Sequence, residues 1–299
     1  MSEQVCAGQV AMVTGASQGG TGTAVAVRLA AEGAAVAITA RSVEGLEQTR
    51  QRIEELGARC LVLPCDLADP DGGRRQLVAR TEEALGPIDI LVNNAARGAY
   101  RPFNEVTPDR LESMLQVNFK APWELMNDVV DGMRERGRGW ILNVTTFAAE
   151  IPPGPPYPTN KPAKSGSAYG STKAALNRLT VSAASECEGQ GVAVNALAPQ
   201  AAIATPNLVS AGWIDEVMFE PLEAMTEAAL AMCTGDPARL TGRIAFSLQL
   251  LHELDRPVRD LTGNDLVSGW QPADLPAVIA RQAAKLTEIG WTNPFGAAL

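Results

Sequence analysis

The chain has 299 residues, of which 46% are hydrophobic and 20% are charged, as in an ordinary globular protein with a sizeable core. Its net charge of -9 argues against nucleic acid or an anionic membrane as the main partner. No uninterrupted apolar run approaches the roughly 18 residues of a membrane helix, and the polar start does not resemble a signal peptide. We therefore expect a cytoplasmic protein that binds a small-molecule substrate.

Cysteine and histidine usage limits the metal and nucleophile chemistry. The cysteines include no CxxC pair and the chain has one histidine, His252, so the sequence predicts no metal site. The pattern is typical of buried, reduced thiols in a cytosolic protein. A Ser-His-Asp hydrolase would have to use His252, and no GxSxG motif precedes it.

The first predicted elements are a buried strand at residues 9–14, a glycine-rich turn at 15–22 and a helix at 23–32. A strand, a glycine turn and a helix N-terminus together predict an anion site, because free amide groups and the helix dipole face a bound phosphate. We therefore expect nucleotide binding here.

A second strand is predicted at residues 35–40, with Arg41 directly after it. In dinucleotide-binding folds an acidic residue here binds the ribose hydroxyls, whereas an arginine suits a 2′-phosphate. The strand ends without Asp or Glu, so the sequence favours NADP(H) over NAD(H). The alternative is an exposed arginine with no role in binding.

Strands and helices continue to alternate along the chain. We predict helices at 43–56, 71–85 and 108–136, and strands at 59–64, 88–92, 139–144 and 192–197. This alternation predicts βαβ units, and right-handed crossovers then place helices on both faces of a parallel sheet. Ligands bind beyond the carboxyl ends of such strands.

Tyr169 and Lys173 stand four residues apart at the start of a predicted helix, so they share one face. A phenol has a pKa of about 10, and a neighbouring ammonium group lowers it by favouring the phenolate. The pair therefore predicts a tyrosine that transfers a proton to or from a substrate oxygen. A helix-surface pair is the alternative interpretation of this spacing.

Residues 151–165 form a proline-rich connection, and a connection of that length is typical of a functional lid or a disordered piece. Further along we predict a helix at 220–233 and a seventh strand at 240–248. Residues 255–299 form an extension with one predicted helix at 273–288. The extension either covers a neighbouring subunit or closes over the substrate pocket, unless it is only a partly ordered tail.

These segments together resemble the short-chain dehydrogenase/reductase family over residues 8–251. The resemblance rests on the order and spacing of the glycine turn from Gly15, Asp66-Leu67, Asn93-Asn94-Ala95, Asn118, the Tyr169/Lys173 helix, and Asn195 to Pro199. It implies an α/β fold, a single Rossmann-like doubly wound domain with a central, mostly parallel seven-stranded sheet flanked by helices. This domain would occupy residues 1–254, with residues 255–299 as a C-terminal extension.

The resemblance also implies roles for individual residues. Tyr169 would be the general acid-base, Lys173 would lower its pKa and bind the nicotinamide ribose, and Asn118 would hold a water of the proton relay. The family's serine position holds Thr146, whose hydroxyl can hydrogen-bond the substrate oxygen, with Thr145, Ser165 and Ser167 as alternatives. The cofactor-binding residues implied by position are Gly15, Ser17, Gly20, Gly22, Arg41, Asp66, Leu67, Asn94, Ala95, Tyr169, Lys173, Pro199 and Thr205.

The sequence departs from the family pattern at the cofactor loops. Aligned from the helix, Gly20 and Gly22 take the last two glycine places, which leaves one extra residue in the turn. Ala96 and Gln200 stand where glycine is usual, and Thr205 comes one residue late. We therefore expect a lengthened pyrophosphate loop and a remodelled loop over the nicotinamide.

The implied function is an NAD(P)(H)-dependent oxidoreductase that interconverts a secondary alcohol and a ketone by hydride transfer, with NADP(H) preferred. Within this class the alternatives are NAD(H) use or a 3-hydroxyacyl/3-oxoacyl thioester substrate, since Arg97, Arg101, Lys161 and Lys164 could attract an anionic substrate. Outside it, the alternative is a non-catalytic, nucleotide-sensing protein of the same fold. By resemblance alone we expect a homodimer or homotetramer.

Overall fold

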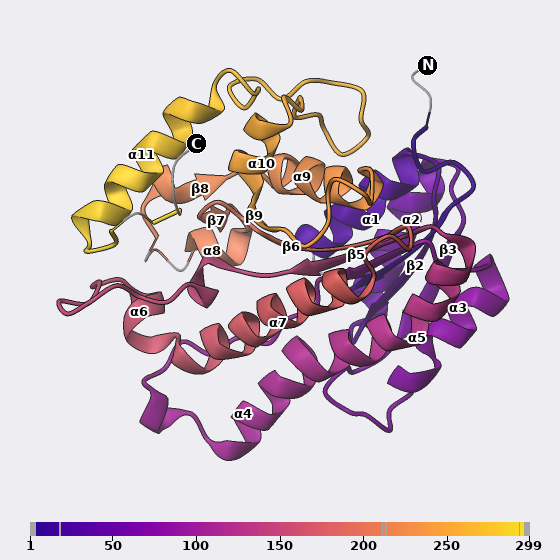
Figure 1. The fold of residues 1–299 in the computed structure, drawn as a ribbon, viewed down its shortest axis with the longest axis horizontal. Coiled ribbons are helices and arrows are strands. Elements are labelled where there is room, and N and C mark those ends of the chain that lie inside the picture. The colour runs from indigo at the N-terminus through magenta and orange to yellow at the C-terminus, as the bar shows by residue number, and fades with distance from the viewer. Residues whose placement is uncertain (1–3, 18, 211, 213, 293, 296–299) are drawn as a thin grey trace.

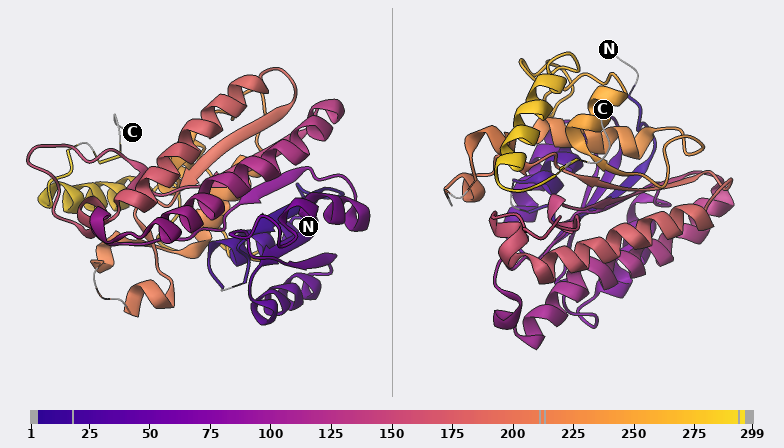
Figure 2. Two further views of the ribbon diagram at one scale, coloured as in Figure 1. Left: turned by 90° about the horizontal axis from the view of Figure 1, so that it is seen from below. Right: turned by 60° about the vertical axis from the view of Figure 1, so that its left-hand side comes forward.

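A computed structural model describes residues 4–17, 19–210, 212, 214–292 and 294–295. Its centre is one seven-stranded sheet in the order β3-β2-β1-β4-β5-β6-β9, with helices packed on both faces (Figures 1 and 2). The strands are β1 (Val10–Thr14), β2 (Ala35–Ala40), β3 (Cys60–Pro64), β4 (Ile90–Asn93), β5 (Gly139–Val144), β6 (Val192–Ala198) and β9 (Ile244–Phe246). The predicted doubly wound, Rossmann-like fold is confirmed, and every strand pairing in this sheet is parallel.

Two hydrophobic cores lie on opposite faces of the sheet. Ala11 and Val13 of β1 belong to one core, whereas Val10 and Met12 belong to the other, because side chains alternate along a strand. With both faces covered, the strands are continuous apolar runs. The first core is covered by α1 (Thr21–Ala31), α2 (Val43–Glu55), α9 (Leu222–Thr234) and α10 (Ser247–Glu253), and the second by α3 (Leu77–Leu85), α5 (Ala121–Arg136) and α7 (Ser167–Glu186).

The long helix predicted at 108–136 is divided in two. α4 (Pro108–Leu115) runs into a π-helical turn at Gln116–Lys120, and α5 follows directly. The wider turn contains Asn118, which is fully buried and hydrogen-bonded to both the loop after β4 and α7. Single π-helical turns inside helices frequently occur at functional sites.

The predicted seventh strand at 240–248 is wrong at both ends. β9 covers Ile244–Phe246 only, and α10 begins at Ser247. Before the strand, Gly242 turns the chain with a φ of +71°. After it, the Ser247 Oγ donates a hydrogen bond to the Glu220 carboxylate at 2.7 Å. These contacts limit the strand, although the apolar pattern continues beyond it.

Several short elements lie in the loops at the carboxyl ends of the strands. The proline-rich connection ends in α6 (Lys161–Ser165), and the loop after β6 contains α8 (Pro206–Ser210). In the same loop, β7 (Ala202–Ile203) pairs in parallel with β8 (Phe219–Glu220). These elements lie at the sheet edge where ligands bind in such folds.

The C-terminal extension packs on the rest of the chain. Its helix α11 (Leu275–Glu288) contributes Leu275, Val278 and Ile279 to the core that contains α1 and α9, and Val258 joins them. Figure 1 places α11 on the same side of the molecule as α6 and α8. Within the described residues, no helix combines the length and hydropathy needed to cross a bilayer.

Candidate active site

The glycine-rich turn between β1 and α1 forms a cradle for an anion. Gly15 has a left-handed φ of +72°, and a Cβ there would lie 2.8 Å from the Cα of Ala95. A Cβ on Gly22 would overlap the side-chain amide of Asn94. A Cβ on Gly20 would meet no neighbouring atom. Gly20 is the N-cap of α1, and no side chain caps this end of the helix, so the first main-chain amides of α1 are open to a phosphate.

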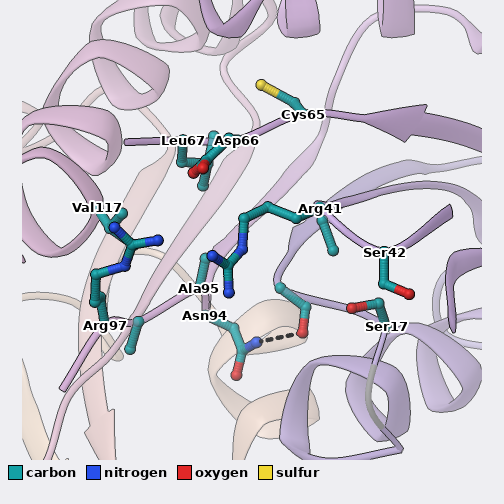
Figure 3. A pocket seen from close by; sticks show the side chains of 13 residues that line it. Ser17, Arg41, Ser42, Cys65, Asp66, Leu67, Asn94, Ala95, Arg97 and Val117 are labelled. Atoms are coloured by element: carbon teal, nitrogen blue, oxygen red, sulfur yellow. Dashed lines mark hydrogen bonds between the residues drawn. The ribbon is translucent and has the colours of Figure 1, made fainter. Parts of the chain in front are cut away.

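Asn94 joins this turn to the end of β4. Its Nδ2 donates to the main-chain oxygen of Thr14 at 2.8 Å. The same Nδ2 also donates to the main-chain oxygen of Gly15 at 3.2 Å (Figure 3). The main-chain amides of Asn94 and Ala95 both donate to the Thr14 Oγ1 at 3.0 Å. These bonds hold two strand ends, and the walls of the pocket between them, in fixed positions.

A pocket of 390 Å³ opens beyond the carboxyl ends of β1 to β4 (Figure 3). It brings together the predicted cofactor residues Gly15, Ser17, Arg41, Asp66, Leu67, Asn94 and Ala95. It is also lined by Ala40, Ser42, Cys65, Ala96, Arg97 and Val117, none of which the sequence had assigned to the cofactor. The predicted cofactor residues that do not line it are Gly20, Gly22, Tyr169, Lys173, Pro199 and Thr205.

The pocket carries positive charge from two arginines. Figure 3 shows the side chains of Arg41 and Arg97 entering it from opposite sides. Arg97 hydrogen-bonds the Ser113 hydroxyl, whereas Arg41 forms no salt bridge with any residue that the structure describes. Arg41 also adjoins the N-cap of α2, Ser42. An unpaired guanidinium beside a helix N-terminus fits a phosphate group, so these residues suit a dinucleotide that carries a 2′-phosphate.

Tyr169 lies in the first turn of α7, close to Thr146 just beyond β5. The helix and the turn approach so closely that a Cβ on Gly170 would overlap the Ala148 carbonyl oxygen. The Thr146 hydroxyl accepts a hydrogen bond from the Ala148 amide at 3.2 Å and lies close enough to the Tyr169 phenol to lower its pKa. Burial raises the pKa of Tyr169, and Tyr100 acts in the same direction, while the Thr146 hydroxyl opposes them. The phenol is therefore protonated at neutral pH and able to donate its proton.

None of the alternative hydroxyls acts on the pKa of Tyr169. The Ser165 Oγ donates to the Lys161 carbonyl oxygen at 2.9 Å, and Ser167 is exposed. The Thr145 Oγ1 is buried without a hydrogen-bond partner among the described residues. The geometry thus favours Thr146 for the role of the family's serine.

Lys173 is enclosed one helical turn after Tyr169. Its Nζ donates to the Val144 carbonyl oxygen at the end of β5, at 2.7 Å, and burial lowers the pKa of Lys173 to about 8. The predicted lowering of the Tyr169 pKa by Lys173 is not found in this arrangement. The ammonium group is directed to Val144, and desolvation of the phenol is the largest influence on its pKa.

The Asn118 side chain connects the loop after β4 to the helix that carries Tyr169. Its Nδ2 donates to the Arg97 carbonyl oxygen and to the Thr172 Oγ1, both at 2.9 Å, and its Oδ1 accepts from the Arg97 amide at 2.8 Å. The Thr172 Oγ1 in turn donates to the Tyr169 carbonyl oxygen at 2.8 Å. Both side-chain amide hydrogens of Asn118 are thus engaged. The predicted relay water would therefore have to donate a hydrogen bond to an oxygen atom of the π-helical turn.

A buried carboxylate, which the sequence did not reveal, anchors the loop after β6. Glu220 accepts hydrogen bonds from the Gln200 amide at 3.0 Å and the Ser247 Oγ at 2.7 Å. Burial raises the pKa of Glu220 to about 8. Gln200, which replaces the usual glycine, is also fully buried, and its side-chain amide has no hydrogen-bond partner in the described part of the chain.

Replacing Glu220 with glutamine should flatten the pH dependence of stability between about pH 4 and 8. An unfolded glutamate has a pKa of about 4.3, whereas burial raises that of Glu220 to about 8. The native state therefore binds this proton more tightly, and the free energy of unfolding falls as the pH rises through this window. Urea unfolding at several pH values measures the slope. Glu216→Gln, at an exposed glutamate nearby, should keep it, and an unchanged slope in Glu220→Gln would contradict the assignment.

Comparison with known proteins decides the family. The sequence pattern of the family described as short chain dehydrogenase matches residues 9–211. The chain belongs to this family. A short-chain dehydrogenase relative, a fatty acyl-CoA reductase of Mycobacterium tuberculosis, is 31% identical over 252 residues, which are 83% of this chain and 81% of the relative. Gluconate 5-dehydrogenase of Gluconobacter oxydans is 31% identical over 79% of this chain and 83% of its own length.

A solved short-chain dehydrogenase structure matches the fold described above. It is a 3-oxoacyl (acyl-carrier-protein) reductase from Agrobacterium tumefaciens with NADP bound. The two structures superpose with a TM-score of 0.71 and share 28% sequence identity, and the match covers 82% of this chain and 94% of that chain. These findings confirm the family resemblance and establish an oxidoreductase of the short-chain dehydrogenase family. The roles of individual site residues, the oligomeric state and the cytoplasmic location stay predictions.

Proposed function

We propose that this chain is an NADP(H)-dependent oxidoreductase that interconverts a ketone and a secondary alcohol. The observation that carries the proposal is the placement of Thr146 beside the Tyr169 phenol, with Lys173 buried one turn away. This group lies beyond the end of β5, at the same edge of the sheet as the dinucleotide pocket. That edge is where open α/β sheets bind their ligands.

In the proposed reduction, the hydride and the proton come from two different sources. NADPH, when bound, supplies the hydride that the carbonyl carbon accepts. Tyr169 then donates its phenolic proton to the carbonyl oxygen, which leaves an alcohol and a tyrosinate. Thr146 donates a hydrogen bond to the same oxygen as negative charge develops on it. Lys173, whose Nζ donates to the Val144 carbonyl oxygen, would hold the nicotinamide ribose beside this pair.

The raised pKa of Tyr169 bears on the direction of the reaction. A protonated phenol is the form that donates a proton, and burial maintains that form at neutral pH. Oxidation of an alcohol needs the phenolate instead, which this environment disfavours. The proposal therefore assigns Tyr169 the role of proton donor in the reductive direction.

Replacing Arg41 with alanine should weaken NADPH binding by about ten- to a hundredfold and leave NADH binding unchanged. A charge-assisted hydrogen bond to a phosphate contributes about 1.5 to 3 kcal/mol, and only NADPH carries the 2′-phosphate. Titration of nicotinamide fluorescence measures both affinities. Arg52→Ala, at an exposed arginine near the far end of α2, is the matched control and should change neither. Tighter binding of NADH than NADPH by the wild type would refute the role of Arg41.

The activity itself is tested by following NADPH absorbance with a panel of ketones. Saturable oxidation of NADPH, with the alcohol as product, is the expected result. Tight NADPH binding without turnover on any carbonyl would favour the non-catalytic, nucleotide-sensing alternative. Binding of neither nucleotide would mean that the lengthened glycine turn does not hold a pyrophosphate.

A 3-oxoacyl thioester is the second candidate substrate, and the rim of the site favours it. Apolar side chains on the surrounding loops are largely exposed, namely Phe103 (80%), Ile151 (90%) and Tyr157 (66%). These loops also carry Arg101 and Lys164, and two of the relatives described above act, by name, on acyl thioesters. Apolar and cationic groups together suit an acyl chain on an anionic carrier. Including 3-oxoacyl thioesters in the panel, and comparing kcat/KM, distinguishes the two substrate classes.

A further inference from the structure

The C-terminal extension contributes Trp291 and Phe295 to an aromatic cluster beside Thr146. The next residue, Phe147, packs against Trp291 with ring centroids 4.6 Å apart, against Phe295 at 5.9 Å and against Phe246 at 6.0 Å. Trp291 is only 3% exposed. The buried members of this cluster, Phe147, Leu286 and Trp291, belong to neither of the two cores that cover the faces of the sheet, whereas Phe295 packs against both the cluster and the core that contains α1.

Hydrogen bonds connect the same part of the extension to the proline-rich connection. The Trp291 Nε1 donates to the Asn160 Oδ1 at 3.0 Å, and the Thr159 amide donates to the Ile289 carbonyl oxygen at 2.9 Å. The chain at 289–291 is therefore seated against the segment that leads into α6 and then into Tyr169. The proline-rich connection and the extension form one continuous layer.

α11 also connects the extension to the loop after β6. The Lys285 Nζ lies 3.1 Å from the Asp215 Oδ2, and Met218 packs with Leu286 against the aromatic cluster. Both views in Figure 2 keep α11 beside the loops at this end of the sheet. The extension thus contacts three segments that follow the carboxyl ends of β5 and β6, the edge at which substrate must meet Tyr169.

We propose that the extension closes the substrate side of the active site in its own subunit, and that Trp291 determines which substrates reach Thr146 and Tyr169. The inference rests on the proposed function, because it concerns the pocket of that reaction. Thr146 and Phe147 are consecutive, so the indole packed on Phe147 limits the space on that side of the catalytic hydroxyl. A tail that covered a neighbouring subunit would have its aromatic side chains facing outward, whereas Trp291 is buried within its own chain.

The test compares two tryptophans of the extension. Trp291→Ala removes the indole beside Phe147. Trp270→Ala, the matched control, removes an indole that packs against the core that contains α1 and α9. The readout is the ratio of kcat/KM for a bulky aryl ketone to that for a small aliphatic ketone. We expect Trp291→Ala to raise this ratio about tenfold or more, since pocket contacts of this size discriminate by that factor. NADPH affinity should stay constant in both variants, and Trp270→Ala should leave the ratio unchanged.

Asn160→Ala keeps the proposal testable if Trp291→Ala does not fold, because it removes only the acceptor of the indole N–H. It should shift the ratio in the same direction by a smaller factor. An unchanged ratio in Trp291→Ala, or in Asn160→Ala if that is the variant that folds, overturns the proposal. An equal shift in Trp270→Ala also overturns it, since the effect would then be a general loss of packing.

Hydrogen exchange separates this proposal from the proposed function, because it needs no turnover. Amides at 147–160 should exchange faster in Trp291→Ala than in the wild type or in Trp270→Ala, since the layer over them is loosened. If the wild type reduces no ketone, the proposed function fails, and faster exchange confined to Trp291→Ala still supports closure by the extension. Equal exchange in all three proteins overturns it.

Discussion

Replacing Tyr169 with phenylalanine is expected to lower kcat by about 10²- to 10⁴-fold while NADPH binding is retained. The substitution removes the only atom proposed to donate a proton to the substrate oxygen, and a positioned general acid contributes a factor of this size. The ring itself stays in place, because it packs edge-on against Tyr100 at 5.8 Å. Tyr169 does not line the dinucleotide pocket, so the affinity for NADPH should change little. Steady-state kinetics and nucleotide titration measure the two quantities.

Tyr157→Phe is the matched control for this experiment. Tyr157 lies in the proline-rich connection and is 66% exposed, so loss of its hydroxyl should leave kcat within a factor of two or so. A Tyr169→Phe enzyme with near wild-type kcat would mean that another group, or water, delivers the proton. Thr146 would then be the first residue to substitute.

Replacing Glu227 with alanine is expected to reduce the free energy of unfolding by about 3 to 5 kcal/mol, the cost of leaving a buried charge without its partner. Glu227 in α9 accepts from the Arg28 Nε in α1 at 2.8 Å and from the Arg256 Nε in the extension at 3.1 Å. The side chains of Arg28 and Glu227 are 4% and 2% exposed. The Glu32 carboxylate accepts a hydrogen bond from the Arg28 Nη1, which limits the loss of stability. In the Glu227→Ala variant the Arg28 Nε would still have no partner. Urea unfolding followed by circular dichroism measures the change.

An exposed ion pair in the same chain supplies the comparison. Arg243 and Glu253 form a salt bridge at 2.6 Å, with side chains 40% and 49% exposed. Glu253→Ala should cost less than about 1 kcal/mol, because solvent already screens this pair. Similar unfolding midpoints for Glu227→Ala and Glu253→Ala would show that burial of the Arg28 pair does not matter for stability. The ionic connection between α1, α9 and the extension would then be incidental.

The sequence by itself was sufficient for the sheet, the glycine turn and the residue types of the site. Buried parallel strands are apolar runs separated by amphipathic helices, and both patterns are local. Gly15 and Gly22 could be found because a tight turn before a helix requires residues without a Cβ. The spacing of Tyr169 and Lys173 placed both on one face, because helix geometry is the same in every chain.

The tertiary structure alone decided which groups meet in the site. The approach of Thr146 to Tyr169 depends on the close packing of Gly170 against Ala148, and nothing near Gly170 in the sequence marks that contact. The pKa of Tyr169 is raised because the phenol is buried, and the sequence around Tyr169 does not indicate that burial.

The same limit applies to the last part of the chain. The seventh strand is shorter than its apolar pattern because Ser247 turns to Glu220, and the position of the extension depends on the packing of Trp291 against Phe147. Contacts between residues far apart in sequence leave no periodicity and no fixed spacing. Local pattern therefore determined the elements and the candidate catalytic residues, whereas packing between distant segments determined which of these residues meet.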